Sequence, residues 1–176
     1  MDHTDFWTKP SSLRLEVEGV AGLDVREFRI VDRLNELFSV ELVVVSKDAA
    51  LDLEALIGQG ARFTIELDEA SYGLSRRNFR GIVSEMHHLR AEEHGLSTYQ
   101  LTVSPEFWLL TQRSNCRVFQ QMTDIDIVKT LLGEWNLQVE DRCASSFKPR
   151  KYRVQYQETD FAFVSRLLES AGITYS

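Results

Sequence analysis

The chain has few of the residues that cross-link or interrupt small folds: its 176 residues include two cysteines, three prolines and nine glycines. Cys116 and Cys143 lie outside any CxxC pair and away from paired histidines. We therefore expect two buried thiols, with a disulfide or a metal site as the alternative. The absence of low-complexity stretches, together with 43% apolar and 27% charged residues, argues against a disordered chain and indicates a globular one.

Positive charge is in the minority, with 20 Lys and Arg against 27 Asp and Glu and a formal net charge of -7. This sign disfavours nucleic acid as a partner, because phosphate recognition needs clustered cations. Two basic segments oppose the balance, and we expect each to be a solvated surface, with contact to an acidic protein partner as the alternative. Their cations are Arg76, Arg77 and Arg80 in the first, and Lys148, Arg150, Lys151 and Arg153 in the second.

Long apolar runs are also missing. The longest, "LVVV" and "FWLL", are far too short to span a bilayer, so we predict no membrane span. The first ten residues, "MDHTDFWTKP", lack a basic region followed by an apolar stretch, which predicts that there is no signal peptide. These absences predict a chain that is made and folded in the cytosol.

Catalytic motifs are absent too. The only G-x-G is "GQG" at residues 58–60, and Phe63 stands where a dinucleotide fingerprint needs its third glycine. No P-loop, G-x-S-x-G elbow or H-E-x-x-H motif is present. The histidines are His3, His87, His88 and His94, and adjacent His87 and His88 would point to opposite faces of a strand. We therefore predict no catalytic, cofactor-binding or metal-binding residues, no cofactor, and exposed or hydrogen-bonded histidines.

The first hundred residues are dominated by alternation of apolar and polar side chains, which predicts β-strands. "LRLEV" at 13–17 and "FSVELVVV" at 38–45 show it best, and the second becomes apolar on both faces at Val43 and Val45, as if that end were enclosed. Further strands are expected at 25–31, 61–68, 78–89 and 97–103, and "LDLEALIG" predicts one helical turn. About six antiparallel strands favour closure into a barrel, because closure removes exposed edges.

Helical spacing replaces alternation after Pro105. One helix is predicted after Thr123, an N-cap with Asp126 three residues on, and a second after Thr159 or Asp160, ending at Gly172. Their apolar stripes are Ile125, Val128, Leu131, Leu132 and Trp135 in the first helix, and Phe161, Val164, Leu168 and Ala171 in the second. The predicted fold class is α+β: a mainly antiparallel β-barrel or meander at 1–104 and a part with two amphipathic helices at 105–176.

The last residues, "GITYS", begin like another strand. Such a segment is expected to expose an unpaired edge, which would pair either with a second copy or with a loop of its own chain.

Several separated motifs resemble one known family. "FWLLTQRSNCRVFQQMTDIDIVKTLL" at 107–132 and "YRVQYQETDFAFVSRLLESAGITY" at 152–175 are similar to the amino-terminal region of VgrG, the trimeric spike protein of the bacterial type VI secretion system. That region is itself similar to the baseplate hubs of contractile-tailed phages. The earlier segments "LNELFSVELVVVS", "LDLEALIGQ" and "FRGIVSEM" agree more loosely but in the expected order, so the resemblance covers nearly the whole chain.

The resemblance implies a structural, non-enzymatic spike or hub protein, here truncated after Ser176. It implies pseudo-repeated β-barrels that cap an Hcp-like hexameric tube, a homotrimer in the full-length protein, and contacts with baseplate proteins and secreted effectors. It also implies assembly in the bacterial cytoplasm and injection into a target cell. A phage or prophage baseplate hub is the close alternative, and a small cell-wall hydrolase is the alternative from another class. Without the resemblance, Phe107, Trp108 and Leu109 are expected to be packing residues, Arg166 a salt-bridge or solvent residue, and Asp160 a helix cap.

Overall fold

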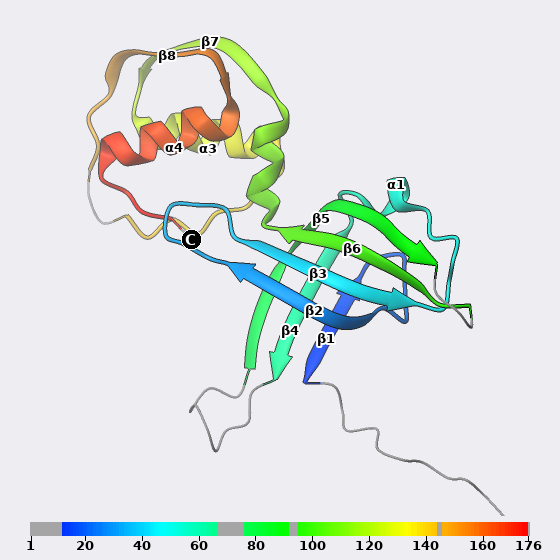
Figure 1. Cartoon of the computed structure of the whole chain (residues 1–176). Coiled ribbons are helices and arrows are strands. Elements are labelled where there is room, and N and C mark those ends of the chain that lie inside the picture. Colours follow the sequence, from blue (N-terminus) through cyan, green and yellow to red (C-terminus); the bar gives the residue numbers. More distant parts are fainter. Residues whose placement is uncertain (1–11, 67–75, 92–94, 144–145, 176) are drawn as a thin grey trace, which may run out of the picture. The chain divides into compact units, whose positions relative to one another are not determined.

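The computed structural model describes residues 12–66, 76–91, 95–143 and 146–175. The chain divides into two compact units (Figure 1). Unit 1 takes Met1–Val31 and Ser39–Pro105, and unit 2 takes Asp32–Phe38 and Glu106–Ser176. The change of pattern at Pro105 therefore falls where unit 1 ends. Residues 32–38 also belong to unit 2, and the sequence pattern does not predict this.

In its described residues, unit 1 is one six-stranded antiparallel sheet with one short α-helix. Its strands run in the order β1-β4-β5-β6-β3-β2, and all six alternating segments are confirmed as strands. Their bounds are β1 Leu13–Val17, β2 Asp24–Val31, β3 Ser39–Ser46, β4 Gly60–Glu66, β5 Arg76–Ala91 and β6 Ser97–Ser104, and the helix α1 is Leu53–Leu56. Gly58, at φ +83°, follows α1 as the predicted stop.

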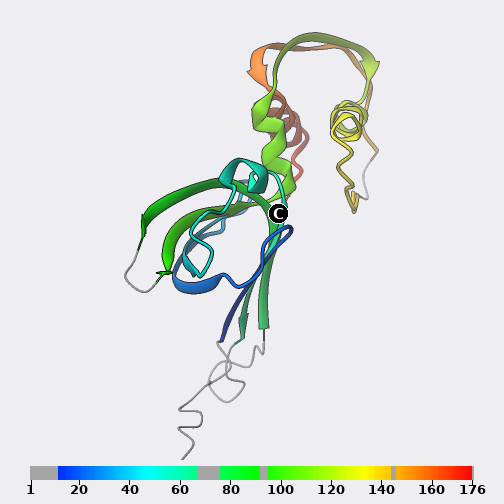
Figure 2. The same ribbon diagram turned by 90° about the vertical axis from the view of Figure 1, so that its right-hand side faces the viewer.

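The sheet curls strongly onto itself as a half-barrel (Figure 2), which confirms the antiparallel β class. In the described part of the chain, β1 and β2 are the two edge strands and are not joined to each other by a ladder. Only β4, β5 and β6 follow one another as a meander. On one side of this meander β1 pairs with β4, and on the other side β3 of the β2–β3 hairpin pairs with β6. The outer strands of the sheet are therefore joined to strands that lie far away in the sequence.

The concave core of unit 1 follows the alternation of its strands. In β3, Val40, Leu42 and Val44 are buried as predicted, and Val45 on the other face is buried too, which confirms that this end is enclosed. Tyr99 is almost fully buried, and its hydroxyl donates to the backbone carbonyl of Asp48 at 3.0 Å, so its one polar atom is paired.

β5 and β6 approach each other unusually closely at Gly81. A Cβ atom at this position would lie 1.9 Å from the carbonyl oxygen of Ser104 and 2.7 Å from its carbonyl carbon. Both atoms belong to the backbone, which cannot rotate out of the way as a side chain can. Glycine is therefore required here by space.

Unit 2 places two helices beneath a two-stranded antiparallel ribbon (Figure 1). A 3₁₀ helix, η2, at Glu106–Gln112 leads into the ribbon strand β7, Ser114–Met122, and then into α3, Asp124–Glu134. The second ribbon strand, β8, is Arg150–Thr159, and it runs directly into α4, Asp160–Ala171. Both predicted helices are confirmed, whereas the sequence pattern does not predict the 3₁₀ helix.

The ends of both helices are formed by the residues that the sequence indicated. Thr123 and Asp126 make a reciprocal capping box at α3, in which the Thr123 hydroxyl accepts from the Asp126 backbone N–H at 3.1 Å. At α4 the cap is Thr159, whose hydroxyl accepts from Ala162 N–H at 3.1 Å. Gly172 ends α4 in the left-handed conformation at φ 69°.

The core of unit 2 lies between the helices and the ribbon. The predicted stripe residues Val128, Leu131, Val164 and Leu168 are all buried. Sequence spacing missed a second row, because each helix packs against its partner helix as well as against the ribbon. This row consists of Ile127, Phe163 and Leu167, all fully buried. Of the predicted packing residues 107–109, Phe107 packs edge-on against the rings of Phe161 and Tyr175.

The last described residues do not form a strand. Tyr175 pairs instead with Asn35, in the segment of residues 32–38 that belongs to unit 2. The Tyr175 backbone N–H donates to Asn35 Oδ1 at 3.0 Å, and Asn35 N–H donates to the Tyr175 carbonyl at 3.2 Å. The Tyr175 hydroxyl donates to the Asn35 carbonyl at 2.9 Å. Of the two expected partners for this segment, the structure has a loop of the same chain.

Candidate functional site

The described histidines lie apart from any cluster of metal-ligating residues. His87 and His88 are both exposed on β5, and the His88 ring lies 5.1 Å from the ring of Tyr99, centroid to centroid. His3 and His94 fall outside the described residues. Within the described ranges, no three His, Cys, Asp or Glu side chains are placed to hold a metal ion. In the same ranges, none of the helices has the length and hydropathy that a bilayer span requires.

Both cysteines are exposed free thiols, so the expectation that they are buried is wrong. Cys116 lies in β7 opposite Tyr156 of β8, on the outer face of the ribbon, which no other described element covers. Cys143 lies in the segment after α3, beyond the helical core. The carboxylate of Asp141 beside it raises the pKa of the Cys143 thiol, because it accepts a hydrogen bond from the protonated form.

A hollow in unit 1 is bordered by three carboxylates, Glu18, Asp48 and Asp52. Two of these have local structural roles. Asp48 Oδ1 accepts from the backbone N–H of Ala50 at 2.9 Å, and Asp52 Oδ1 accepts from Ala55 N–H at 3.1 Å as the N-cap of α1. The carboxylates shape a turn and a helix start, and they do not converge on a ligand position.

The most organised polar cluster in the described chain is centred on Asp160 in unit 2. Asp160 is fully buried, and three side chains donate to its carboxylate. Gln155 Nε2 lies 2.8 Å from Oδ1, while Arg113 Nε and Trp135 Nε1 lie 2.7 and 3.0 Å from Oδ2. Burial raises the pKa of this carboxyl, but the three hydrogen bonds and the charge of Arg113 outweigh it, so that the pKa lies below its ordinary value.

The Asp160 cluster continues outward through Arg113 to Glu134, at the end of α3. Arg113 Nη2 lies 2.5 Å from one Glu134 oxygen, and Arg117 spans both oxygens at 3.0 and 2.5 Å. The hydrogen bond from Arg117, aided by Arg113, lowers the pKa of Glu134 against the effect of burial. Residues from β7, α3 and α4 are thereby held in one network.

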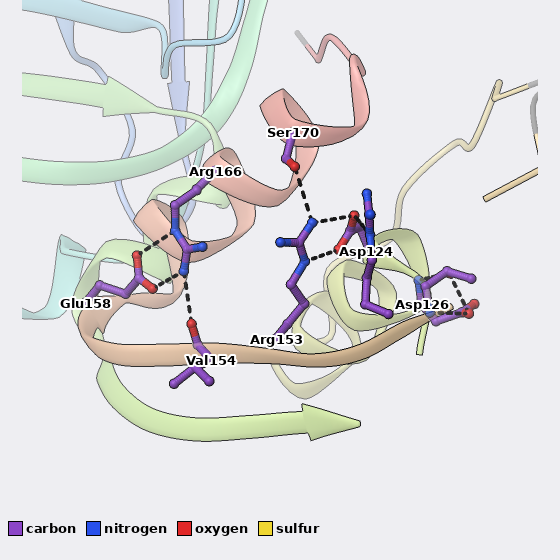
Figure 3. A network of polar contacts seen from close by, with 9 residues as sticks. Asp124, Asp126, Arg153, Val154, Glu158, Arg166 and Ser170 are labelled. Atoms are coloured by element: carbon purple, nitrogen blue, oxygen red, sulfur yellow. Dashed lines mark hydrogen bonds and ion pairs between the residues drawn. The ribbon is translucent and has the colours of Figure 1, made fainter. Parts of the chain in front are cut away.

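A second buried carboxylate, Asp124, anchors the start of α3 to β8 (Figure 3). Arg153 binds both of its oxygens, with Nε 2.6 Å from Oδ1 and Nη2 2.9 Å from Oδ2, and Nη2 also reaches Ser170 Oγ of α4 at 3.2 Å. Arg150 Nε adds a contact of 3.2 Å. The hydrogen bond from Arg153 is the main cause of a lowered pKa at Asp124. Two cations of the basic segment 148–153 are therefore engaged within the unit, contrary to the expectation of a solvated surface.

Of the two expectations for Arg166 on α4, a salt bridge or solvent, the structure has the salt bridge. Arg166 binds Glu158 of β8 at 2.5 Å, and its Nη2 also donates to the backbone carbonyl of Val154 at 3.0 Å (Figure 3). Arg166 therefore contacts the backbone of β8 itself.

The outer face of the ribbon carries four of the six exposed large apolar side chains in the described part of unit 2. Val118 of β7 lies opposite Val154 of β8. Tyr152 and Tyr156 lie on β8 two residues before and two residues after Val154. Their exposed fractions are 61% for Val118, 66% for Tyr152, 40% for Val154 and 68% for Tyr156. We call these four residues the ribbon patch. Tyr152, Val154 and Tyr156 alternate along β8 and so share one face, but spacing alone does not show that this face is left uncovered.

The two buried carboxylates in the described part of unit 2 are each held by several donors: Asp124 by arginines, and Asp160 by an arginine, an amide and an indole. The signal that could have revealed Asp160 was its place at the start of an amphipathic helix, five residues after Gln155. Its partners Arg113 and Trp135 lie 47 and 25 residues away, and spacing alone does not connect them.

Comparison with solved structures assigns the fold to contractile-machine proteins. The Escherichia coli c3393 protein, described as a component of the type VI secretion system with structural similarity to the T4 phage tail proteins gp27 and gp5, matches with a TM-score of 0.78 and 26% identity. The match covers 93% of this chain and 44% of that one. The 43 kDa tail protein of prophage MuSo2 from Shewanella oneidensis shares the fold, with a TM-score of 0.60 at 15% identity over 91% of this chain and 48% of that one.

The profile of the phage tail baseplate hub (GPD) family matches residues 31–176, and the chain belongs to that family. Among its curated relatives, the Pseudomonas aeruginosa type VI secretion system spike protein VgrG1c is 40% identical over 174 residues, and VgrG1b is 36% identical over 166 residues. These alignments cover 98% and 92% of this chain but only 23% and 22% of the relatives. The chain thus spans about a quarter of their length, and the resemblance found in the sequence is confirmed.

Proposed function

We propose that this chain acts as the amino-terminal hub region of a type VI secretion spike, a structural part and not an enzyme. The observation that carries the proposal is the 40% identity to the spike protein VgrG1c across 98% of the chain. Residues 1–104 and 105–176 are then two parts of one hub region. The half-barrel supplies the surface toward a tube, and the arginine-linked unit 2 supplies a stiff flank.

The proposed partners follow from the same assignment. The hub caps an Hcp-like hexameric tube, contacts baseplate proteins, assembles as a homotrimer in the full-length spike and carries secreted effectors. It assembles in the bacterial cytoplasm and leaves with the spike on firing. A Francisella PdpA-VgrG complex, whose matching chain is 14% identical and shares the fold alone, is a precedent for a protein partner of such a hub.

A chimaera tests the proposal. This chain would replace the matching amino-terminal residues of VgrG1c in a P. aeruginosa strain lacking its other spike genes. We expect tube protein and chimaera to appear together in the culture supernatant. The same chimaera carrying Phe163→Ala, which removes a buried ring, is the control that should lose secretion. A stable chimaera that accumulates in cells without any secreted tube protein would contradict the proposal.

A phage or prophage baseplate hub is the second candidate, favoured by the family match over residues 31–176. A chimaera that restores infectivity to a hub-deficient phage, but no secretion, would decide for it. The hydrolase alternative has a separate test, in which the purified chain is incubated with peptidoglycan. We expect no released muropeptides.

A further inference from the structure

The two long edges of the unit 2 ribbon differ. On β8, Arg166 occupies the backbone carbonyl of Val154 at 3.0 Å and is itself held by Glu158. A further strand could not pair with β8 at this point without displacing the arginine. On β7, the described chain offers no second neighbour, since the sheet has only the two strands β7 and β8. Proteins normally protect such an edge, and among the described residues Arg166 does so for β8 at Val154.

The open edge of β7 borders the ribbon patch. Val118 belongs to β7 itself, and Tyr152, Val154 and Tyr156 lie on the adjacent strand of the same face, 40–68% exposed. Exposed apolar side chains that are contiguous, rather than scattered, mark interaction surfaces. An added strand would extend this face and could lay its own apolar side chains against Val118.

The unpaired cations near the ribbon patch indicate the charge that a partner should carry. Nearly every described cation of unit 2 has a carboxylate within 4.0 Å: Arg33, Arg113, Arg117, Lys129, Arg142, Arg150, Arg153 and Arg166. In the described part of unit 2, Lys148 and Lys151 are the exceptions, and both are exposed. They precede Tyr152 at one end of the ribbon patch, in a chain whose net charge is -7.

We propose that the β7 edge and the ribbon patch accept an extended segment of another protein by strand addition. The segment has aliphatic side chains at alternate positions and carboxylates near its amino-terminal end. Its backbone pairs antiparallel with β7, and its aliphatic side chains pack beside Val118. Because Tyr152 lies opposite Gln120 of β7, the antiparallel segment begins at the end where Lys148 and Lys151 lie. The proposal does not depend on which contractile machine contains the hub.

A defined peptide tests this proposal. The probe is fluorescein-labelled Glu-Glu-Val-Thr-Val-Thr-Val-Thr, and its control has proline in place of each threonine, which keeps the charge but prevents strand pairing. We expect saturable anisotropy changes with the probe and none with the control. Val118→Lys should weaken binding about tenfold or more. Val139→Lys, at an equally exposed valine of unit 2 outside the ribbon, should leave it unchanged.

Further variants keep the test decisive. Lys151→Glu should weaken binding and reduce its dependence on salt. Tyr156→Lys serves as a second patch variant if Val118→Lys lowers the melting temperature. Binding absent up to about 1 mM probe, a concentration at which even weak affinity is detected, would overturn the proposal. Equal binding of the proline control would do the same. Sedimentation showing a dimer that Val118→Lys abolishes would assign the patch to a second copy and overturn the proposed partner.

Discussion

The two units hold together in different ways. Unit 1 depends on a continuous hydrogen-bonded ladder across six strands and on a core in which Val40, Phe63 and Val103 are fully buried. The described part of unit 2 has only a two-stranded ladder, which is too little to be stable alone. Its strands are held by the helices beneath them and by arginines bound to Asp124, Glu134 and Asp160.

The difference shows how a small unit can be made rigid. Apolar burial is non-directional, whereas an arginine that binds both oxygens of a carboxylate fixes distance and angle. Arg153 joins β8 to both α3 and α4, and Arg113 joins the start of the ribbon to α3 and α4. We therefore expect unit 2 to depend on charge in a way that unit 1 does not.

The largest expected effect comes from removing one buried ring in each unit. Phe63→Ala in unit 1 and Phe163→Ala in unit 2 should each lower the free energy of unfolding by about 3–5 kcal/mol, through lost burial and an unfilled cavity. Native-state hydrogen exchange should locate each loss in the unit that carries the change. Leu34→Ala, at a side chain 64% exposed, is the control and should change stability by less than about 0.5 kcal/mol. Loss of protection spread equally over both units would refute the comparison.

Shortening the helical stripes should cost slightly less. We expect Val128→Ala and Leu168→Ala to lower the free energy of unfolding by about 2–4 kcal/mol, if their surroundings cannot collapse into the space. Thermal melts followed by circular dichroism at the helix band would measure it. Melts unchanged within error would show that the two side chains do not support the core of unit 2.

Asp160→Asn removes the charge that the Asp160 cluster is built on. The amide replaces one carboxylate oxygen by a donor that faces Arg113 or Gln155, so we expect a loss of about 2 kcal/mol. Glu134→Gln is the matched control at the outer end of the same network and should cost less, because that site is partly exposed. If chemical denaturation showed the same loss of unfolding free energy for both variants, burial would not make the Asp160 contacts more important than those of Glu134.

Acid should lower the stability of unit 2, as Asp160→Asn does, but by a smaller amount. The pKa values of Asp124, Glu134 and Asp160 are lower in the folded chain than their ordinary values. Their contribution is therefore complete above the unfolded pKa, near 4, and is lost as pH falls through the folded values. At about pH 3.5 these carboxylates are only partly protonated, so only part of their contribution to stability is lost. Hydrogen exchange at this pH and at neutral pH should show protection falling in unit 2 before unit 1, and the reverse order would contradict the prediction.

Arg166→Met should have the smallest effect on stability. The Arg166–Glu158 pair is partly exposed, with Arg166 47% exposed, and such pairs contribute about 0.2–1 kcal/mol. The change should nevertheless be visible locally, because the carbonyl of Val154 loses its donor. A carbonyl shift at Val154 in NMR spectra, with an almost unchanged melting temperature, is the expected result. No shift would place Arg166 away from this edge in solution.

Local features of both units could be predicted from the sequence because they depend on neighbouring residues. The alternation at 13–17 and 38–45, the Thr123 cap and the Gly172 stop each lie within a few positions of the element they define. Sheet order could not be predicted in this way, since alternation assigns a face to each strand but not a neighbour. The pairing of β1 with β4 depends on a contact between segments about 50 residues apart.

The same reason explains the errors at the polar sites. A buried Cys116 is the ordinary expectation because free cysteine usually is buried, but the ribbon has an uncovered face and Cys116 lies on it. Of the two caps that the sequence offers for α4, Thr159 is the one used, whereas the Asp160 carboxylate turns inward to residues supplied by other elements. Arg150 and Arg153 belong to a segment that looks like surface, although their partner Asp124 lies 26 and 29 residues earlier.

The contact at Gly81 has a consequence for how this chain can vary among organisms. Every single-nucleotide change that replaces a glycine codon by another amino acid introduces a Cβ atom, which here would lie 1.9 Å from the Ser104 carbonyl oxygen. No amino acid can therefore replace glycine at position 81 unless the backbone of β5 first moves away from β6. In a saturation mutagenesis library selected for folding, glycine should be the sole survivor at this position, while the exposed neighbour Arg80 accepts many residues.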